Sequence, residues 1–261
     1  MIPVSDALIQ EFVVVVMLVS LRIFGFFLSA PMFAFGALPM RMRVFFALVI
    51  GFAISPVIKP DPSLLQGSSP TFVAAIIELF IGLMAGYVIR LGLMAFDVLS
   101  ETLSMLSGFS FAATFGRDPT LSPGLIGAFL QMTAVVLIFV LNIHLVAMDI
   151  VLDSFKFIPF GTWPAGWNID GVALLVLKAF AFGMVLSMPS IIVYLVFNMT
   201  QAILGRTSPQ LNLFSVGFAV SVPIALLLVI VLLPDMPGIV TRILEGPIAL
   251  IRSGLTPGVG Q

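Results

Sequence analysis

Apolar residues in this chain gather into six long segments, at about 12–38, 44–58, 72–107, 121–148, 171–198 and 211–233. Three stretches, 119–148, 179–205 and 207–234, contain no Asp, Glu, Lys or Arg. A helix of about 20 apolar residues crosses a hydrocarbon core roughly 30 Å thick. The pattern therefore predicts an all-α, polytopic integral membrane protein of about six hydrophobic helices.

The lengths of these segments are uneven. The segment at 44–58 is short for a membrane span, whereas the one at 72–107 would reach roughly 54 Å as a single helix. That long segment either breaks near Gly92 or extends well beyond the lipid. Pro31, Pro189 and Pro223 lie inside or near the segments, where proline kinks a helix. We expect contacts with protein, and not the bilayer alone, to set these helix lengths.

Composition and charge narrow the function further. The chain is 61% hydrophobic and 9% charged, with a net charge of −1, so it offers no basic patch for nucleic acid. It contains no cysteine, which excludes disulfides and thiolate metal sites. Residues 1–11 carry no Lys or Arg, so the first segment is expected to remain as a helix instead of a cleaved signal. The tail from Asp235 is expected to form a short interfacial helix with a frayed end.

Signatures of an enzyme are missing from the sequence. It has no H-E-x-x-H, G-x-S-x-G or P-loop pattern. His144 is the only histidine, and no second His, Cys or carboxylate stands beside it at metal-ligand spacing. We therefore predict no enzymatic activity, no cofactor and no metal. An intramembrane enzyme of lipid metabolism would also lack a nucleophile.

Charged residues inside the third segment are the first functional candidates, because such groups are costly in a membrane. Arg90, Asp97 and Glu101 fall within about 20° of one line on a helix. Nearby, Gly82 and Gly86 form a G-x-x-x-G step that lets another backbone approach closely. The favoured interpretation is an inter-helix polar stripe that holds helices together. The alternative is a small secondary transporter that uses Arg90, Asp97 and Glu101 as ion- or proton-coupling residues.

Arg22 interrupts the first segment near its middle. A guanidinium at that depth needs an acceptor, which the sequence does not identify.

Two connecting stretches have unusual compositions. The stretch 108–116 alternates phenylalanine with small residues, so it is either a helix end or an apolar loop whose rings exclude water at a constriction. The stretch 206–218 is a polar reversal between two long apolar segments, with Pro209 to set a turn and Gln210 and Asn212 to cap it.

Together these motifs resemble the FliR family, the export-gate component of bacterial flagellar type III secretion (SctT in injectisomes). The matching residues are Arg22 with Ala30-Pro31, Leu38-Pro39 with Arg41, Ser110-Phe111-Ala112 before Asp118-Pro119, Asn142-Ile143-His144-Leu145, Pro159-Phe160-Gly161, and 206–218 around Pro209-Gln210-Leu211-Asn212. Two positions depart from the family pattern. Gly116-Arg117 adds length before Asp118, and Ala219 stands where a proline is usual.

The resemblance implies a gate assembled in the bacterial inner membrane, within the flagellar basal body. FliP-type and FliQ-type subunits would form the channel entrance with this chain, a FlhB-type subunit would wrap it, and a FlhA-type subunit would couple it to energy. Residues 1–170 would be a FliP-like helical part. Residues 171–261 would be a FliQ-like helical hairpin with a C-terminal tail.

The resemblance also assigns roles to the two unusual stretches. The pore plug loop would map to 108–119, with Phe109, Phe111 and Phe115 sealing the closed pore. The hairpin tip would carry Arg206, Pro209, Gln210 and Asn212 and would face the cytoplasm. The implied function is a structural and gating subunit of the flagellar type III protein export channel, which passes unfolded flagellar proteins across the inner membrane.

Overall fold

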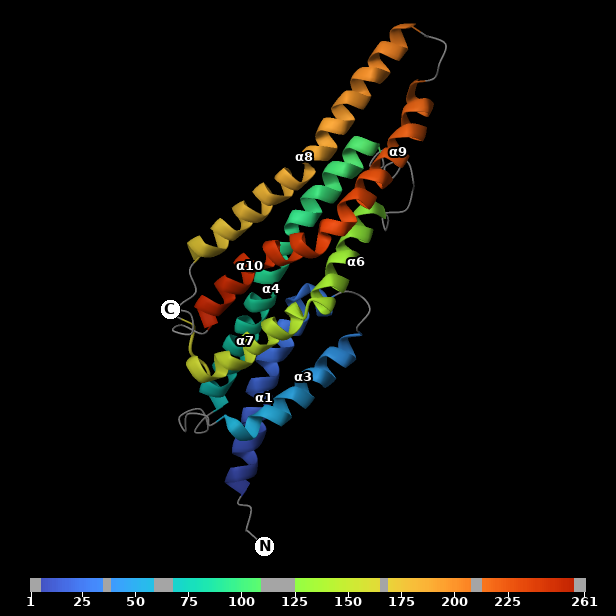
Figure 1. Cartoon of the computed structure of the whole chain (residues 1–261). Coiled ribbons are helices and arrows are strands. Elements are labelled where there is room, and N and C mark those ends of the chain that lie inside the picture. Colours follow the sequence, from blue (N-terminus) through green and yellow to red (C-terminus); the bar gives the residue numbers. More distant parts are fainter. Residues whose placement is uncertain are drawn as a thin grey trace. The chain divides into compact units, whose positions relative to one another are not determined.

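The structure, a computed structural model, describes residues 6–34, 39–58, 68–108, 125–164, 169–207 and 213–255, and over these ranges it has helices and no strand (Figure 1). The helices are α1 (Asp6–Ser29), α2 (Pro31–Ala34), α3 (Met40–Ile54), α4 (Ser68–Ser107), α6 (Leu125–Val140), α7 (Ile143–Phe157), α8 (Ile169–Thr207), α9 (Leu213–Leu232) and α10 (Met236–Leu255), with 3₁₀ turns η1 (Ser55–Val57) and η4 (Leu233–Asp235). Among the described residues, five helices are long and apolar enough to cross a membrane, or six if α6 and α7 count as one bent span. The predicted all-α, polytopic membrane fold is confirmed.

The long third segment forms one continuous helix. Helix α4 has 40 residues, which corresponds to about 60 Å. It passes through Gly92 without a break, so the alternative in which the helix ends there is wrong. A helix of this length projects well beyond a hydrocarbon core of roughly 30 Å.

The fourth apolar segment consists of two helices instead of one. The axes of α6 and α7 are bent by 67°. Asn142 lies at the break in the left-handed region, with φ 57°, a conformation that asparagine tolerates better than most residues. His144 packs its ring on Phe139, and its Nδ1 lies 3.4 Å from the carbonyl oxygen of Ile138.

Helix α8 is longer than the apolar run at 171–198 indicated, whereas α9, with 20 residues, is slightly shorter than the run at 211–233. Helix α8 has 39 residues and contains Pro189, and α9 contains Pro223. Helix α10, with 20 residues, replaces the short interfacial helix expected in the tail.

The chain divides into two compact units. The first comprises 1–91, 138–175 and 245–261, and the second comprises 92–137 and 176–244. The division near residue 170 that the resemblance implies concerns likeness to other subunits, and it stays a prediction.

Glycines bring α1 and α4 into backbone contact in the first unit. A Cβ on Gly82 would overlap the carbonyl oxygen of Arg22, and one on Gly25 would overlap that of Leu79. Gly86 lies against the hydroxyl of Ser29 in the same way. The close approach expected at the G-x-x-x-G step is therefore confirmed, and its partner is the first helix.

In the second unit, α8 and α9 pair as antiparallel helices. The Tyr194 hydroxyl donates a hydrogen bond to the carbonyl oxygen of Ser221 over 2.6 Å, and Gly217 lies against the side chain of Gln201. The Ser221 hydroxyl in turn donates to the carbonyl oxygen of Ser107 at the end of α4 over 2.7 Å. These bonds join three helices inside an apolar unit, where an unpaired hydroxyl would be costly.

Replacing Gly82 with valine should destabilise the first unit by about 1–3 kcal/mol or more, because the new side chain meets backbone atoms that cannot rotate away. Gly238→Ala is the matched control: a Cβ there meets nothing within 4 Å, and alanine favours a helix interior. The thermal unfolding midpoint in detergent should fall for Gly82→Val and stay level or rise for Gly238→Ala. Equal midpoints for Gly82→Val and the natural protein would contradict the close approach.

Candidate functional site

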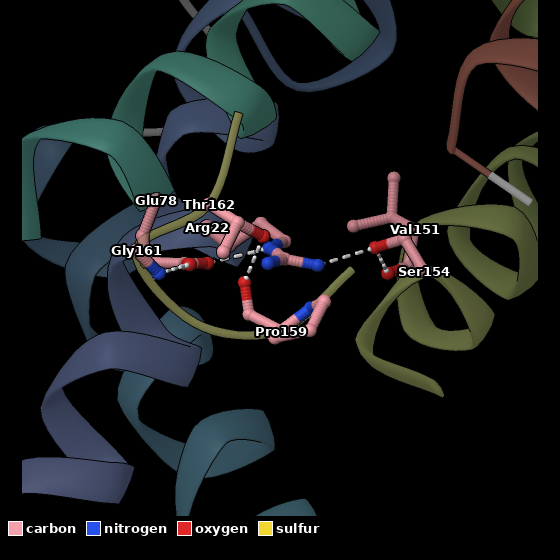
Figure 2. A network of polar contacts seen from close by, with 7 residues as sticks. All are labelled: Arg22, Glu78, Val151, Ser154, Pro159, Gly161 and Thr162. Atoms are coloured by element: carbon pink, nitrogen blue, oxygen red, sulfur yellow. Dashed lines mark hydrogen bonds and ion pairs between the residues drawn. The ribbon is translucent and has the colours of Figure 1, made fainter. Parts of the chain in front are cut away.

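A buried ion pair lies at the contact between α1 and α4. Arg22 Nε donates to Glu78 Oε2 over 2.6 Å, and both side chains are fully buried (Figure 2). Gly82 stands one helical turn after Glu78 and touches the backbone of Arg22. The small residue at this turn brings the two helices close enough for the guanidinium and the carboxylate to meet.

Two further segments complete the cluster. Arg22 Nη1 donates to Ser154 Oγ of α7 over 2.8 Å, and the guanidinium carbon lies 4.2 Å from the centre of the Phe155 ring. The backbone N–H of Gly161 donates to Glu78 Oε1 over 3.2 Å. Gly161 has φ 74°, a conformation that glycine adopts without strain. A single charged pair thus ties together α1, α4, α7 and the turn after α7 (Figure 2).

The hydrogen bonds of this cluster hold the helices in fixed positions. Both oxygens of Glu78 accept a hydrogen bond, while Arg22 Nη2 has no partner among the described residues. Two ions removed from water need such contacts to offset the loss of hydration. In the part of the chain that the structure describes, no three His, Cys, Asp or Glu residues gather into a metal site. The contacts of the cluster hold three helices and a turn together.

The sequence predicted part of this arrangement. It indicated that Arg22 needs an acceptor, but the acceptor stands 56 positions away and could not be chosen from other carboxylates. Ser154 and the turn at Gly161 were missed as partners. The only signal for the turn was Pro159-Phe160-Gly161, which was noted as a motif and not as a ligand to a charge.

The predicted polar stripe lies on an exposed face of α4. Arg90, Asp97 and Glu101 are all exposed in this chain. The Gln131 side chain of α6 donates a hydrogen bond to Asp97, which links the two helices. Arg90 and Glu101 take part in no ion pair within the described ranges. The stripe is therefore a surface with charges open to contact from outside the chain.

The other predicted residues fall mostly outside the described part of the chain. Phe109, Phe111 and Phe115 of the expected plug, and Pro209, Gln210 and Asn212 of the expected hairpin tip, all lie there. At the edges of these stretches, Gly108 ends α4 with φ 81°, and Arg206 is exposed in the last turn of α8.

Breaking the buried pair should cost far more than breaking an exposed one. Glu78→Gln keeps an acceptor for Gly161 but leaves Arg22 buried without a counter-ion, so we expect a loss of about 3–5 kcal/mol in unfolding free energy. The double variant Arg22→Met with Glu78→Gln removes both charges and should regain most of this loss. Thermal unfolding in detergent measures each variant.

The control for this experiment is the pair of Lys156 with Asp153, which are 2.6 Å apart; Lys156 is largely exposed and Asp153 partly so. Lys156→Met should leave the unfolding midpoint unchanged, because exposed pairs contribute little. A Glu78→Gln protein as stable as the natural one, or a double variant less stable than the single, would contradict this assignment of the cluster.

Comparison with known proteins places the chain in a family. Residues 13–246 match the family described as bacterial export proteins, family 1. The chain is 31% identical over 221 residues to the flagellar biosynthetic protein FliR of Caulobacter vibrioides, covering 82% of this chain and 86% of the relative. It is 26% identical over 236 residues to FliR of Buchnera aphidicola from Acyrthosiphon pisum, covering 90% and 91%. It is 27% identical over 223 residues to FliR of Escherichia coli, covering 82% of each.

The family match covers α4, α6 and α7 in full and α1 from residue 13 onward, and so includes the buried cluster and the exposed stripe. The sequence resemblance to FliR is thereby confirmed over most of the length. The chain belongs to the bacterial export proteins, family 1.

Proposed function

We propose that this chain is a structural and gating subunit of the flagellar type III protein export channel in the bacterial inner membrane. Its family and the names of its relatives support a role in the flagellar export apparatus. It assembles with FliP-type and FliQ-type subunits, with FlhB-type and FlhA-type subunits beside them. It passes unfolded flagellar proteins and carries out no chemical step of its own.

The apolar surface of α8 is the observation that carries this proposal. Exposed apolar side chains run along this helix from Ile169 to Leu204, a rise of about 52 Å. The hydrocarbon core is roughly 30 Å thick, and membrane helices tilt by about 20° on average. Lipid therefore covers only part of this face. Other protein subunits cover the remainder, which favours an assembled channel over a self-contained transporter.

The exposed stripe on α4 supports the same arrangement. Arg90 and Glu101 are unpaired within the described residues, and apolar side chains of Tyr87 and Met105 are exposed on the same helix. Charges framed by apolar groups are poorly solvated by lipid and well suited to a polar helix of a partner. We assign this face of α4 to contacts with a neighbouring subunit.

The gating mechanism is steric. The loop that begins after Gly108 alternates bulky phenylalanines with small residues, so it can seal a pore and still yield to an arriving chain. Phe109, Phe111 and Phe115 exclude water and ions in the closed gate. An unfolded substrate displaces the loop, and the loop returns after passage.

Reversing one charge of the stripe should weaken assembly without harming the fold. Arg90→Glu changes an exposed side chain, so the thermal unfolding midpoint of the purified chain should stay the same. Its recovery with a co-expressed FliP-type subunit should fall, because like charges would face each other in the interface. Arg242→Glu on the exposed surface of α10 is the matched control. Undiminished co-purification of Arg90→Glu would exclude this face as a subunit contact.

Removing the loop should open the assembled gate. Deletion of 108–115 in the complete gate should give a steady ion leak, measured as conductance in planar bilayers. Serine at Phe109, Phe111 and Phe115 keeps the loop length while removing the rings, and it should leak to a similar degree because the seal is apolar. If the deleted gate conducts no more than the natural one, the plug assignment is wrong.

A further inference from the structure

Helices α1 and α3 enclose a groove that none of the roles described above uses. It has a volume of about 390 Å³ and is lined almost wholly by apolar groups, among them Met17 and Phe24 of α1 and Val44, Ala47 and Leu48 of α3. This size lies within the range of sites that bind small ligands. All of its lining residues belong to the first compact unit, so the groove lies within that unit.

The groove is open on the outside of the helix pair. Ala47 is buried at its floor, whereas Met17, Val44 and Leu48 at its rim are exposed. At the other end of α3, Gly51 lies against Ser20 and closes the two helices on each other. Ser20 also lines the groove, so the helices touch directly beside it and the groove follows α1 from Val13 to Phe24. An elongated apolar ligand fits this shape.

Two arginines precede the α3 residues that line the groove. Arg41 and Arg43 lie in the first turn of α3, within about one turn of Val44. Arg41 lies close to the helical line of Leu48, and Arg43 lies on the other side of the lining face. The first turn has no acidic residue, and Pro39 at the N-cap provides no side-chain hydrogen bond. The N-terminus of α3 therefore adds its positive field to the charge of the exposed Arg41 guanidinium.

The two arginines also mark the depth of the groove in the membrane. The candidate span on α3 covers Met40–Val57, and residues 44–57 contain no charged side chain. Arg41 and Arg43 consequently lie at the polar end of the span, where phosphate groups of lipids are found. The apolar groove matches the acyl chain of a phospholipid, and the positive charge beside it matches the phosphate.

We propose that this groove binds one anionic phospholipid, with an acyl chain between α1 and α3 and its phosphate at the exposed Arg41. The bound lipid fills the space that the two helices leave open and fixes their relative angle. A partner polypeptide is the competing occupant. It is disfavoured because the slot is narrow and its lining offers almost no polar atoms for a backbone.

The test is native mass spectrometry of the delipidated full-length chain after addition of dioleoyl phosphatidylglycerol or dioleoyl phosphatidylcholine. The natural protein should retain one phosphatidylglycerol in preference to phosphatidylcholine. Arg41→Gln should reduce this retention about fivefold, since one arginine near a lipid phosphate has an effect of that order. Arg41→Lys should keep it, which separates loss of charge from loss of fold.

A second pair of variants tests the apolar part. Val44→Phe extends a ring from the rim into the groove and should abolish retention of phosphatidylglycerol. Val49→Phe makes the same change on the opposite face of α3, at an exposed position, and should leave retention unchanged. The proposal is overturned by equal retention of both lipids, by full retention in Arg41→Gln, or by equal effects of the two phenylalanines. It is also overturned if a photo-crosslinker at position 44 in native membranes captures a polypeptide in place of lipid.

Discussion

The buried ion pair of Arg22 with Glu78 is the constraint on which the first unit depends. An arginine in the middle of an apolar helix is tolerated only when a counter-ion stands within hydrogen-bonding distance and water is replaced by other donors and acceptors. That distance is reached because Gly25 and Gly82 let α1 and α4 touch through their backbones. The ion pair and the glycines therefore depend on each other. The glycines would bring the helices together in more than one register, and the pair selects the register in which Glu78 meets Arg22.

The sequence predicted the helices and the close contact at the glycines better than it predicted which helices pack together. Charge-free stretches revealed the helices, and the spacing of Gly82 and Gly86 revealed a close contact. Neither pattern identifies the partner, because packing between segments far apart in the chain leaves no periodic trace in either one. The bend between α6 and α7 was missed for a related reason. It rests on the backbone conformation of Asn142 in a stretch that is uniformly apolar, so hydropathy continues through the break.

The length of α4 illustrates a limit of reasoning from the bilayer. A segment of 36 apolar residues suggested either a break or a projection, and glycine at position 92 was a reasonable place for a break. Gly92 is instead buried inside a continuous helix. Burial at this position stabilises the helix by more than the glycine weakens it. In the channel that we propose, the lengths of α4 and α8 reflect contacts with neighbouring subunits more than the thickness of the lipid.

Ionisable residues of the membrane-embedded helices fall into two groups in this chain. One group is buried and paired and contributes to stability, and the other is exposed and available for assembly. Arg22 and Glu78 satisfy each other inside one unit, so their contribution is complete before any partner arrives. Arg90 and Glu101 lie exposed on α4, without ion pairs among the described residues. In lipid such groups are strongly unfavourable, and in an interface they become favourable only when the partner supplies opposite charges or hydrogen bonds. In the export channel that we propose, neighbouring subunits cover the exposed faces of α4 and α8, and the free energy released there drives the chain into the complex.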